Sequence, residues 1–246
     1  MSIVAQTRQT LFDLCNRLLE SALPASCLLC HGGTGGSILC PACAADLPLL
    51  PPARCPICAA PTPASAVCGQ CLKKPPHFDS TYAIWRYDFP LDKLIQAYKY
   101  GHQLALSRFF GEALKTILPP AAPTAPRPNW DRIIPLPLAE PRLRQRGYNQ
   151  SQELARPLAQ HLGAPLDTGI CSRPRHTLPQ AELPLSGRAK NIRNAFACHG
   201  SLVGKALLLV DDVMTTGASL NECARTLKLH GAARVDVAIL ARTCHH

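Results

Sequence analysis

Hydrophobic residues in the second part of the chain gather in short unbroken runs that alternate with helical patterns. The predicted strands are 80–87, 131–136, 206–210 and 234–241, and the predicted helices lie within 90–118, 151–161 and 218–230. Apolar runs without polar alternation are typical of strands buried on both faces of a parallel sheet. The proline-rich stretch 119–128 predicts a loop, because proline permits little regular structure. The pattern therefore predicts an α/β fold with a parallel sheet.

The first 24 residues show a different pattern, with leucines at helical spacing that mark one face of an amphipathic helix. Arg8, Asp13, Arg17 and Glu20 interrupt it, so it lacks the apolar core of a secretion signal. No run in the chain approaches the ~18 apolar residues of a membrane span. We expect a cytoplasmic protein whose helix 1–24 docks on its own domain; a partner or membrane surface is the alternative.

Composition and charge add two constraints. The chain is 47% hydrophobic but only 5% aromatic, which predicts an aliphatic core. The formal net charge is +10, yet residues 1–80 hold five Lys/Arg against four acids, so the basic character belongs to residues 81–246. Such a surface suits a phosphate-rich ligand or a nucleic acid.

The chain has thirteen cysteines, and eight of them form four Cys-x-x-Cys pairs in its first part. The pairs are Cys27 and Cys30, Cys40 and Cys43, Cys55 and Cys58, and Cys68 and Cys71. The unit of two pairs repeats at an offset of 28 residues, with turn-rich segments inside each unit. Two such pairs complete a tetrahedral site for one metal ion, so the array predicts two zinc ions. Pairing in sequence order is preferred, and an interleaved scheme remains open.

Zinc explains the array better than the alternatives do. Disulfides need an oxidising compartment, for which the sequence carries no signal. A redox role for one pair would leave the other three unexplained. Because four thiolates fill the coordination shell, both ions are expected to be structural. A segment this rich in proline and glycine buries little apolar surface by itself, so zinc is expected to drive its folding.

One stretch, "LLLVDDVMTTGAS" (207–219), combines an aliphatic run, two carboxylates and a turn rich in small and hydroxylated residues. Ligands of open parallel sheets bind beyond the carboxyl ends of the strands, where we expect Asp211 and Asp212 to lie. The turn that follows offers backbone N–H groups and hydroxyls to a phosphate. Acids beside a phosphate cradle predict a sugar phosphate as ligand.

All thirteen residues of this stretch resemble the 5-phosphoribosyl-1-pyrophosphate (PRPP) signature of type I phosphoribosyltransferases. The resemblance implies that Asp211 and Asp212 contact the ribose hydroxyls. It also implies that the following loop holds the 5-phosphate through Thr215, Thr216, Gly217, Ala218 and Ser219.

The cysteine pairs, "RLRQRGYNQ" (142–150) and "HTLPQAELPLSGRAKNIRNAF" (176–196) are together similar to the ComF/GntX family. The resemblance covers essentially the whole chain. It implies a double zinc ribbon at 25–75 and a type I phosphoribosyltransferase-like domain at 79–246. Members of the family are associated with natural competence, the uptake of single-stranded DNA, and with gluconate utilisation. The resemblance also brings in a competence helicase or DNA-processing proteins as partners.

Two basic segments are expected to serve the same site. Arg142, Arg144, Arg146 and Gly147 follow the strand at 131–136, where type I enzymes have their pyrophosphate loop, and arginine suits bidentate phosphate contact. A solvated basic turn is the plainer alternative. A second segment resembles the flexible loop that closes over type I active sites. Its candidate residues are His176, Gln180, Arg188, Lys190, Asn191 and Arg193.

Two functional hypotheses follow, and the sequence leaves turnover open. In the first, PRPP binds with Mg²⁺, and phosphoribosyl transfer to an acceptor, a nitrogen base, releases pyrophosphate. In the second, the PRPP fold is a scaffold or sensor, the zinc ribbons are an adaptor surface, and the basic loops bind single-stranded DNA. Lys99 and Tyr100 also resemble a family feature, whose role stays open.

Overall fold

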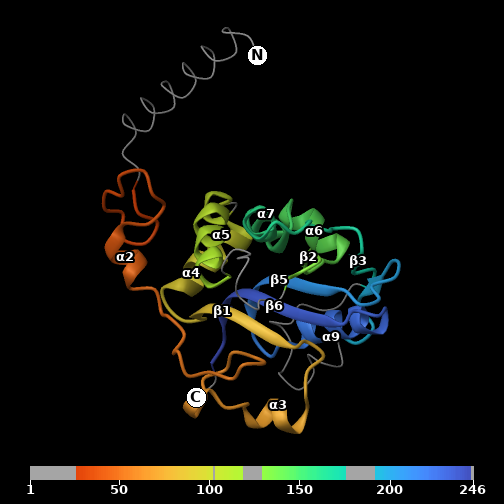
Figure 1. Cartoon of the computed structure of the whole chain (residues 1–246). Helices are drawn as coiled ribbons and strands as arrows, with labels where there is room; N and C mark the ends of the chain where they lie inside the picture. Colours follow the sequence, from red (N-terminus) through yellow and green to blue (C-terminus); the bar gives the residue numbers. More distant parts are fainter. Residues whose placement is uncertain (1–25, 102, 119–128, 176–191, 245–246) are drawn as a thin grey trace. The chain divides into compact units, whose positions relative to one another are not determined.

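The computed structural model describes residues 26–101, 103–118, 129–175 and 192–244 (Figure 1). Within the chain, Met1–Leu47 and Pro48–His246 form two compact units. The predicted helix 1–24 and loop 119–128 lie outside the described residues. None of the helices in the described ranges is both long enough and apolar enough to cross a membrane.

The larger unit is built on a four-stranded sheet of order β1-β6-β5-β2 in which every neighbouring pair is parallel (Figure 1). The strands are β1 Ser80–Arg86, β2 Arg132–Pro135, β5 Ala206–Met214 and β6 Arg234–Arg242. All four predicted strands are therefore present, and the predicted parallel α/β fold is confirmed. The core is aliphatic as expected: nearly every apolar residue of β5 and β6 is fully buried.

Helices cover both faces of this sheet. One face carries α4 Leu91–Tyr100, α5 Ala105–Ile117, α6 Glu140–Arg146 and α7 Gln150–Leu162, and the other carries α9 Ala218–Leu229 (Figure 1). The predicted helical region 90–118 divides into α4 and α5, because α4 ends where Gly101 caps it. A two-stranded antiparallel ladder, β3 Cys171–Ser172 and β4 Ala197–Cys198, lies outside the main sheet.

Strand β5 is longer than the sequence pattern predicted. The expectation ended the strand at 210 and put both acids beyond it, whereas β5 continues through Asp211 and Asp212 to Met214. The reason is its central position. On one side β2 stops at Pro135, opposite Val210, but on the other β6 continues to pair, up to Met214 opposite Arg242. The two carboxylates therefore stand on a strand that has lost one neighbour.

The segment 137–150 was expected to be a loop, and the structure contains helix α6 within it. Pro141 is tolerated because it lies in the first turn, where its missing N–H forfeits no helical hydrogen bond. Gly147 ends the helix with φ of 81°, in the left-handed region that glycine adopts without strain. In the structure Gly147 is thus the C-cap of α6.

The four cysteines at 55–71 belong to the larger unit. They surround helix α3, Gly69–Lys73, and the short 3-10 turn Pro63–Ser65. Cys55, Cys58 and Cys71 are buried in the same core cluster as Leu209, Ile239 and residues of α9. In the smaller unit, a β-bridge joins Ser26 to Gly33, helix α2 spans Pro41–Ala45, and Leu39 and Leu47 are buried.

Candidate functional site

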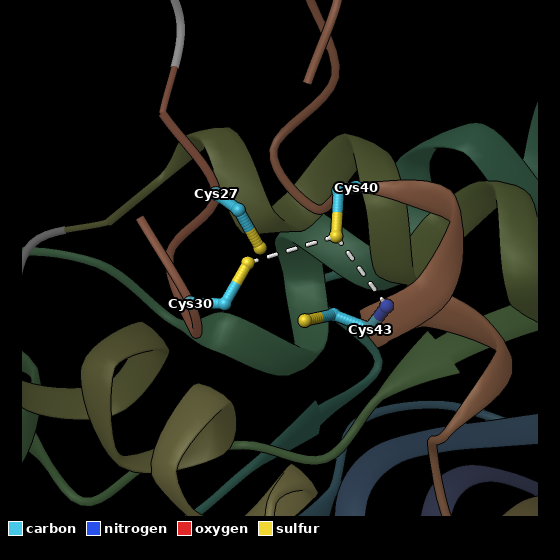
Figure 2. Close-up of side chains that lie close together, drawn as sticks. All are labelled: Cys27, Cys30, Cys40 and Cys43. Atoms are coloured by element: carbon cyan, nitrogen blue, oxygen red, sulfur yellow. Dashed lines mark hydrogen bonds between the residues drawn. The ribbon is translucent and has the colours of Figure 1, made fainter. Parts of the chain in front are cut away.

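The eight paired cysteines form two separate groups of four with their ligand atoms close together. The first cysteine group is Cys27, Cys30, Cys40 and Cys43, and the second cysteine group is Cys55, Cys58, Cys68 and Cys71. Within each group all four sulfur atoms lie within 4.8 Å of one another. Figure 2 shows the side chains of the first group converging from two turns of the chain. Pairing in sequence order is confirmed, and the interleaved scheme is excluded.

Hydrogen bonds around the sulfurs suit metal-binding thiolates. The N–H of Cys43 points at the sulfur of Cys40 at 3.5 Å, and the N–H of Cys71 points at that of Cys68 at the same distance. Peptide N–H groups of Cys30 and Cys40 lower the pKa of the Cys27 thiol to about 6. A closed set of four soft sulfur donors fits Zn²⁺ and leaves no open position for a substrate. Both groups are structural zinc-ribbon sites.

A cavity of about 810 Å³ opens where β5 extends past β2. It brings together most of the residues predicted from the sequence, and helices α4 and α6 and the start of α9 complete it. The predicted residues that line it are Asp211, Asp212, Thr215, Gly217, Ala218, Ser219, Arg142 and Arg146. Its size is that of a pocket for a nucleotide-sized ligand.

The two adjacent carboxylates have different partners. Ser151, in the first turn of α7, donates a hydrogen bond of 2.8 Å from its hydroxyl to Asp211 Oδ1. Lys99, in the last turn of α4, forms an ion pair of 2.9 Å with Asp212 Oδ1. The second oxygen of Asp212, Oδ2, is buried and has no hydrogen-bond partner among the described residues. An unsatisfied buried acceptor in a pocket indicates a ligand that supplies the donor.

Burial and neighbouring charges change the pKa values of Asp211 and Lys99. Burial, reinforced by the negative charge of Asp212, raises the pKa of Asp211 to about 7. Burial alone would lower the pKa of Lys99, but the Asp212 carboxylate outweighs it and the pKa is raised. At neutral pH the pair therefore holds one carboxylate neutralised by Lys99 and one carboxyl group that can donate or accept a proton.

The segment 215–219, which joins β5 to α9 and includes the first two residues of that helix, is named the phosphate loop below. Gly217 is the N-cap of α9 with φ of 75°, a left-handed conformation that favours glycine. Helix α9 has 12 residues, and its first residues, Ala218 and Ser219, line the cavity. A helix N-terminus that opens into a pocket favours an anion there. Thr216 is not among the lining residues; its hydroxyl accepts a bond of 3.4 Å from the N–H of Ala218.

The predicted arginines divide into two sets. Arg142 and Arg146 line the cavity, and the Arg146 guanidinium lies 5.1 Å over the ring of Tyr100 at the rim. Arg144 is on the outer side of α6, where it pairs with Glu140 one turn earlier. A third lining arginine, Arg173, is partly buried, and burial together with the Arg142 cation lowers its pKa. Cations crowded beside a helix N-terminus favour an anionic ligand.

Most of the predicted flexible loop lies outside the described residues: His176, Gln180, Arg188, Lys190 and Asn191. Of this set the structure describes Arg193, which is exposed and whose carbonyl accepts a bond of 2.9 Å from Arg175. Just after it, the N–H of Asn194 donates to Glu222 on α9 at 2.7 Å. The bond from Arg175 and the β3–β4 ladder hold the two ends of the segment together, and the bond to Glu222 ties its second end to α9.

Three residues of the site were not assigned a role from the sequence. Lys99 and Ser151 come from different helices and meet the acids only in the folded chain. Arg173 was one of several bases in a basic stretch, and nothing in that stretch marked it as the one that lines the cavity. The sequence placed Lys99 inside the predicted helical region 90–118, and its position in the last turn of α4 is known only from the structure.

Comparison with known proteins agrees with this architecture. The double zinc ribbon domain matches residues 18–72, and the phosphoribosyl transferase domain matches residues 149–245. The chain is thus a double zinc ribbon protein with a phosphoribosyltransferase-type domain. It is 35% identical to the DNA utilization protein YhgH of Salmonella typhi, over 73% of this chain and 79% of that protein. It is 36% identical to competence protein F of Haemophilus influenzae, over 71% of this chain and 78% of that protein.

Identity of this extent over most of both chains shows the family: the protein belongs to the ComF/GntX family, as its motifs predicted. Among solved structures, a purine phosphoribosyltransferase from Pyrococcus horikoshii aligns with 55% of this chain and 69% of its own, at 22% identity and a TM-score of 0.32.

Proposed function

We propose that the protein binds PRPP, or a closely related ribose 5-phosphate ester, in the cavity at the end of β5. The observation that carries this proposal is the buried Asp212 Oδ2, an acceptor without a partner among the described residues, in the same cavity as the phosphate loop. Ribose offers vicinal hydroxyls to that acceptor, and its 5-phosphate suits the N-terminus of α9. A purely structural carboxylate would have both oxygens satisfied.

The other charged and polar residues of the cavity have different roles in the proposed binding. Ser151 orients Asp211, whose carboxyl group would hydrogen-bond a ribose hydroxyl, as acceptor when ionised and as donor when protonated. Lys99 holds Asp212 in place and offsets its charge, so that an anionic ligand is not repelled. Arg142, Arg146 and Arg173 also line the cavity, and a pyrophosphate would gain from bidentate contacts with them.

Magnesium fits this site only when it is bound together with the ligand. Mg²⁺ in proteins commonly takes one or two carboxylates and fills its shell with substrate phosphates and water. Here Lys99 already neutralises Asp212, so the free protein offers a weak cation site. When bound, Mg²⁺ would neutralise pyrophosphate oxygens. The chain's own residues would bind the ribose and orient it.

The test is calorimetric titration of the zinc-loaded protein with PRPP and Mg²⁺. Asp212→Asn should weaken binding by roughly 10–100-fold, the cost of one or two charge-assisted hydrogen bonds. Asp131→Asn is the matched control: Asp131 also pairs with a lysine at 2.9 Å, Lys205, but beside the first residue of β5. It should bind like the parent. Absence of binding by the parent, or equal losses in both variants, would contradict the proposal.

Transfer is the second part of the proposal. The bond between the ribose anomeric carbon and pyrophosphate would break, and a nitrogen base would form the new bond and lose its proton. Buried charges would stabilise the cation-like centre between the two events. The measurement is pyrophosphate release in the presence of candidate bases. Binding without release under any base would limit the function to a PRPP sensor or scaffold.

A second candidate function is binding of single-stranded DNA, in keeping with the names competence protein F and DNA utilization protein carried by the relatives. The observation that favours it is Tyr100, 70% exposed at the cavity rim with Arg146 against its ring. An exposed aromatic ring beside cations is the common element of single-strand binding surfaces. Nine of ten net positive charges also lie after residue 80.

The salt dependence of oligonucleotide affinity separates the two candidates. On single strands the logarithm of affinity should fall with the logarithm of salt by about 0.7 per phosphate contact. Tyr100→Ala should lower affinity by about 1–3 kcal/mol, the value of one stacked base. Phe89→Ala is the matched control, since Phe89 is 74% exposed but does not line the cavity. A flat salt dependence, or equal effects of both substitutions, would rule out this surface.

A further inference from the structure

Arg242, the last residue of β6, lies between the second cysteine group and the phosphate loop. It is buried. Because β6 lies between β5 and β1, the backbone of Arg242 is opposite Met214 on one side and Arg86 on the other. Its Nε donates a bond of 3.0 Å to the carbonyl of Cys58. Its Nη1 donates to the carbonyl of Met214 at 3.1 Å and to that of Thr215. One side chain thus joins a metal ligand to the start of the phosphate loop.

The partners of Arg242 distinguish it from an ordinary buried arginine. Such a residue normally pairs with a carboxylate, because an unpaired buried charge is costly. Among the described residues, each acceptor of the Arg242 guanidinium is a main-chain carbonyl, including that of Thr243 at 2.7 Å. A guanidinium that satisfies carbonyls from separate chain segments fixes those segments relative to one another.

The carbonyl anchors also set the direction of the neighbouring N–H groups. The peptide bonds after Met214 and Thr215 are trans, so each carbonyl and the following N–H point in opposite directions. Because both carbonyls are turned toward Arg242, the N–H groups of Thr215 and Thr216 are turned away from it. The Met214 carbonyl also accepts a bond of 3.0 Å from the N–H of Thr243, so Arg242 shares that anchor with the backbone of the sheet. The next peptide group, at Thr215, is tied to Arg242 through its carbonyl.

A second connection reaches the loop from its other end. The N–H of His77, in the segment after the second cysteine group, donates a bond of 2.6 Å to Asn221 Oδ1 in the first turn of α9. Phe78 lies beneath the turn, where a Cβ on Gly217 would be 3.9 Å from its ring. The chain that surrounds the second metal site is thus bonded to both sides of the phosphate loop.

We propose that Arg242 is a positioning residue through which the second cysteine group holds the phosphate loop in its binding conformation. The loop's role as a phosphate site rests on the function proposed above, but the mechanical connection does not. Metal bound at the second cysteine group fixes the Cys58 carbonyl, Arg242 links that carbonyl to Met214 and Thr215, and the peptide groups of the loop stay oriented. The first cysteine group has no part in this connection.

Hydrogen exchange of the ligand-free, zinc-loaded protein tests the connection directly. In Arg242→Lys, a single ammonium cannot bridge the same carbonyls, so amides of 213–219 and of 55–60 should both exchange faster, by about tenfold. Amides of 207–210, in the buried part of β5, are the internal reference and should not change. The variant keeps all eight cysteines. Acceleration confined to 213–219 would contradict the proposal.

Metal-site variants supply the second arm. Cys58→Ser should accelerate exchange of 213–219, whereas the matched Cys30→Ser should leave that segment unchanged. In Arg242→Lys, adding Cys58→Ser should have little further effect on 213–219, because the connection is already broken. Additive effects, or equal effects of Cys30→Ser and Cys58→Ser, would overturn the coupling.

Ligand titration keeps the two proposals apart. If PRPP binds the parent, Arg242→Lys and Cys58→Ser should each weaken it by roughly tenfold, and Cys30→Ser should not. If the parent binds no PRPP while the exchange results hold, the proposed function fails and the coupling stands. If PRPP binds the parent and Arg242→Lys alike, the positioning role is wrong and the proposed function stands.

Discussion

The two cysteine groups are nearly identical in sequence pattern and differ in their surroundings. Both consist of two Cys-x-x-Cys pairs, and both show the same N–H to sulfur bond in the second pair. The first group lies in the unit Met1–Leu47, and its Cys30 is exposed. The second lies in the unit Pro48–His246, and three of its four cysteines are buried in the core of the sheet.

The difference lies in the bonds that each group makes to the rest of its unit. Around the second group, Arg54 donates to the carbonyl of Ala83 at 2.8 Å and Thr81 donates to that of Ile57 at 2.7 Å. Each bond joins β1 to the metal turn or to the residue just before it, so the turn is bonded along the edge of the sheet. The repeated Cys-x-x-Cys pattern therefore determines what each group binds. The residues around each group determine how much of the protein depends on that metal.

Removing each metal site should produce the largest contrast. Replacing Cys58 and Cys71 by serine should lower the melting temperature of the sheet by about 20 °C, because zinc supplies on the order of 10 kcal/mol and a domain has about 5–15 kcal/mol in total. Replacing Cys30 and Cys43 by serine should leave that transition in place. The measurement is calorimetric melting, with zinc content determined for each variant.

Two outcomes would contradict the expected difference between the two metal sites. If both double variants shift the sheet's transition equally, the two metals serve one cooperative unit and the division at residue 48 has no energetic meaning. If neither variant shifts it, the core packing of Cys55, Cys58 and Cys71 is independent of metal.

The pH dependence of stability should report the same contrast on a smaller scale. The folded-state pKa of Asp211 is about 7, above its ordinary value of 3.8, so this group stabilises the fold at low pH and that contribution is lost as pH rises toward 7. The free energy of unfolding of Asp211→Asn, relative to that of the parent, should therefore rise by about 2 kcal/mol between pH 5.5 and 7.5. Comparing the two proteins at each pH cancels the pH dependence of zinc binding.

The same measurement in metal-site variants tests whether each metal site influences the surroundings of Asp211. With Cys30→Ser in both proteins, the gain should persist. With Cys58→Ser it should shrink, because a loosened core hydrates Asp211 and brings its pKa toward the ordinary value. Denaturant unfolding at each pH measures the gain. An unchanged gain in the Cys58→Ser background would show that the second metal does not influence the cavity.

Much of this comparison could be predicted from the sequence, and the limits have physical causes. The cysteine spacing predicted both metal groups, since Cys-x-x-Cys turns are local structures. The apolar runs predicted the sheet, because burial on both faces leaves a local pattern. The offset of 28 residues made the two groups look equivalent, however, and only tertiary packing separates them.

The candidate site follows the same rule. Asp211, Asp212 and most of the phosphate loop could be named because they are contiguous. Lys99, Ser151 and Arg242 could not be assigned roles, since each meets the site across more than 20 residues of chain and through a different element. The end of β5 was also predicted too early, because the strand's length depends on β6, its partner.

The smallest expected effect concerns a single hydrogen bond at the second group. Thr81 is buried, and its hydroxyl holds the carbonyl of Ile57 in the metal turn. Thr81→Val keeps the volume and removes the donor, which should cost about 1 kcal/mol. Because binding and folding are linked, the second zinc should then leave about fivefold more readily under a chelator, and the first should not.

Thr62→Val is the matched control for the lost hydroxyl. Thr62 donates to the carbonyl of Ala66 at 2.8 Å within the loop that joins the two turns of the second group, and that bond does not reach the sheet. If the sheet supports the metal, Thr81→Val should weaken zinc retention more than Thr62→Val does. Equal effects would mean that the turn holds its metal through its own loop alone. The difference between the two groups would then be one of burial without energetic coupling.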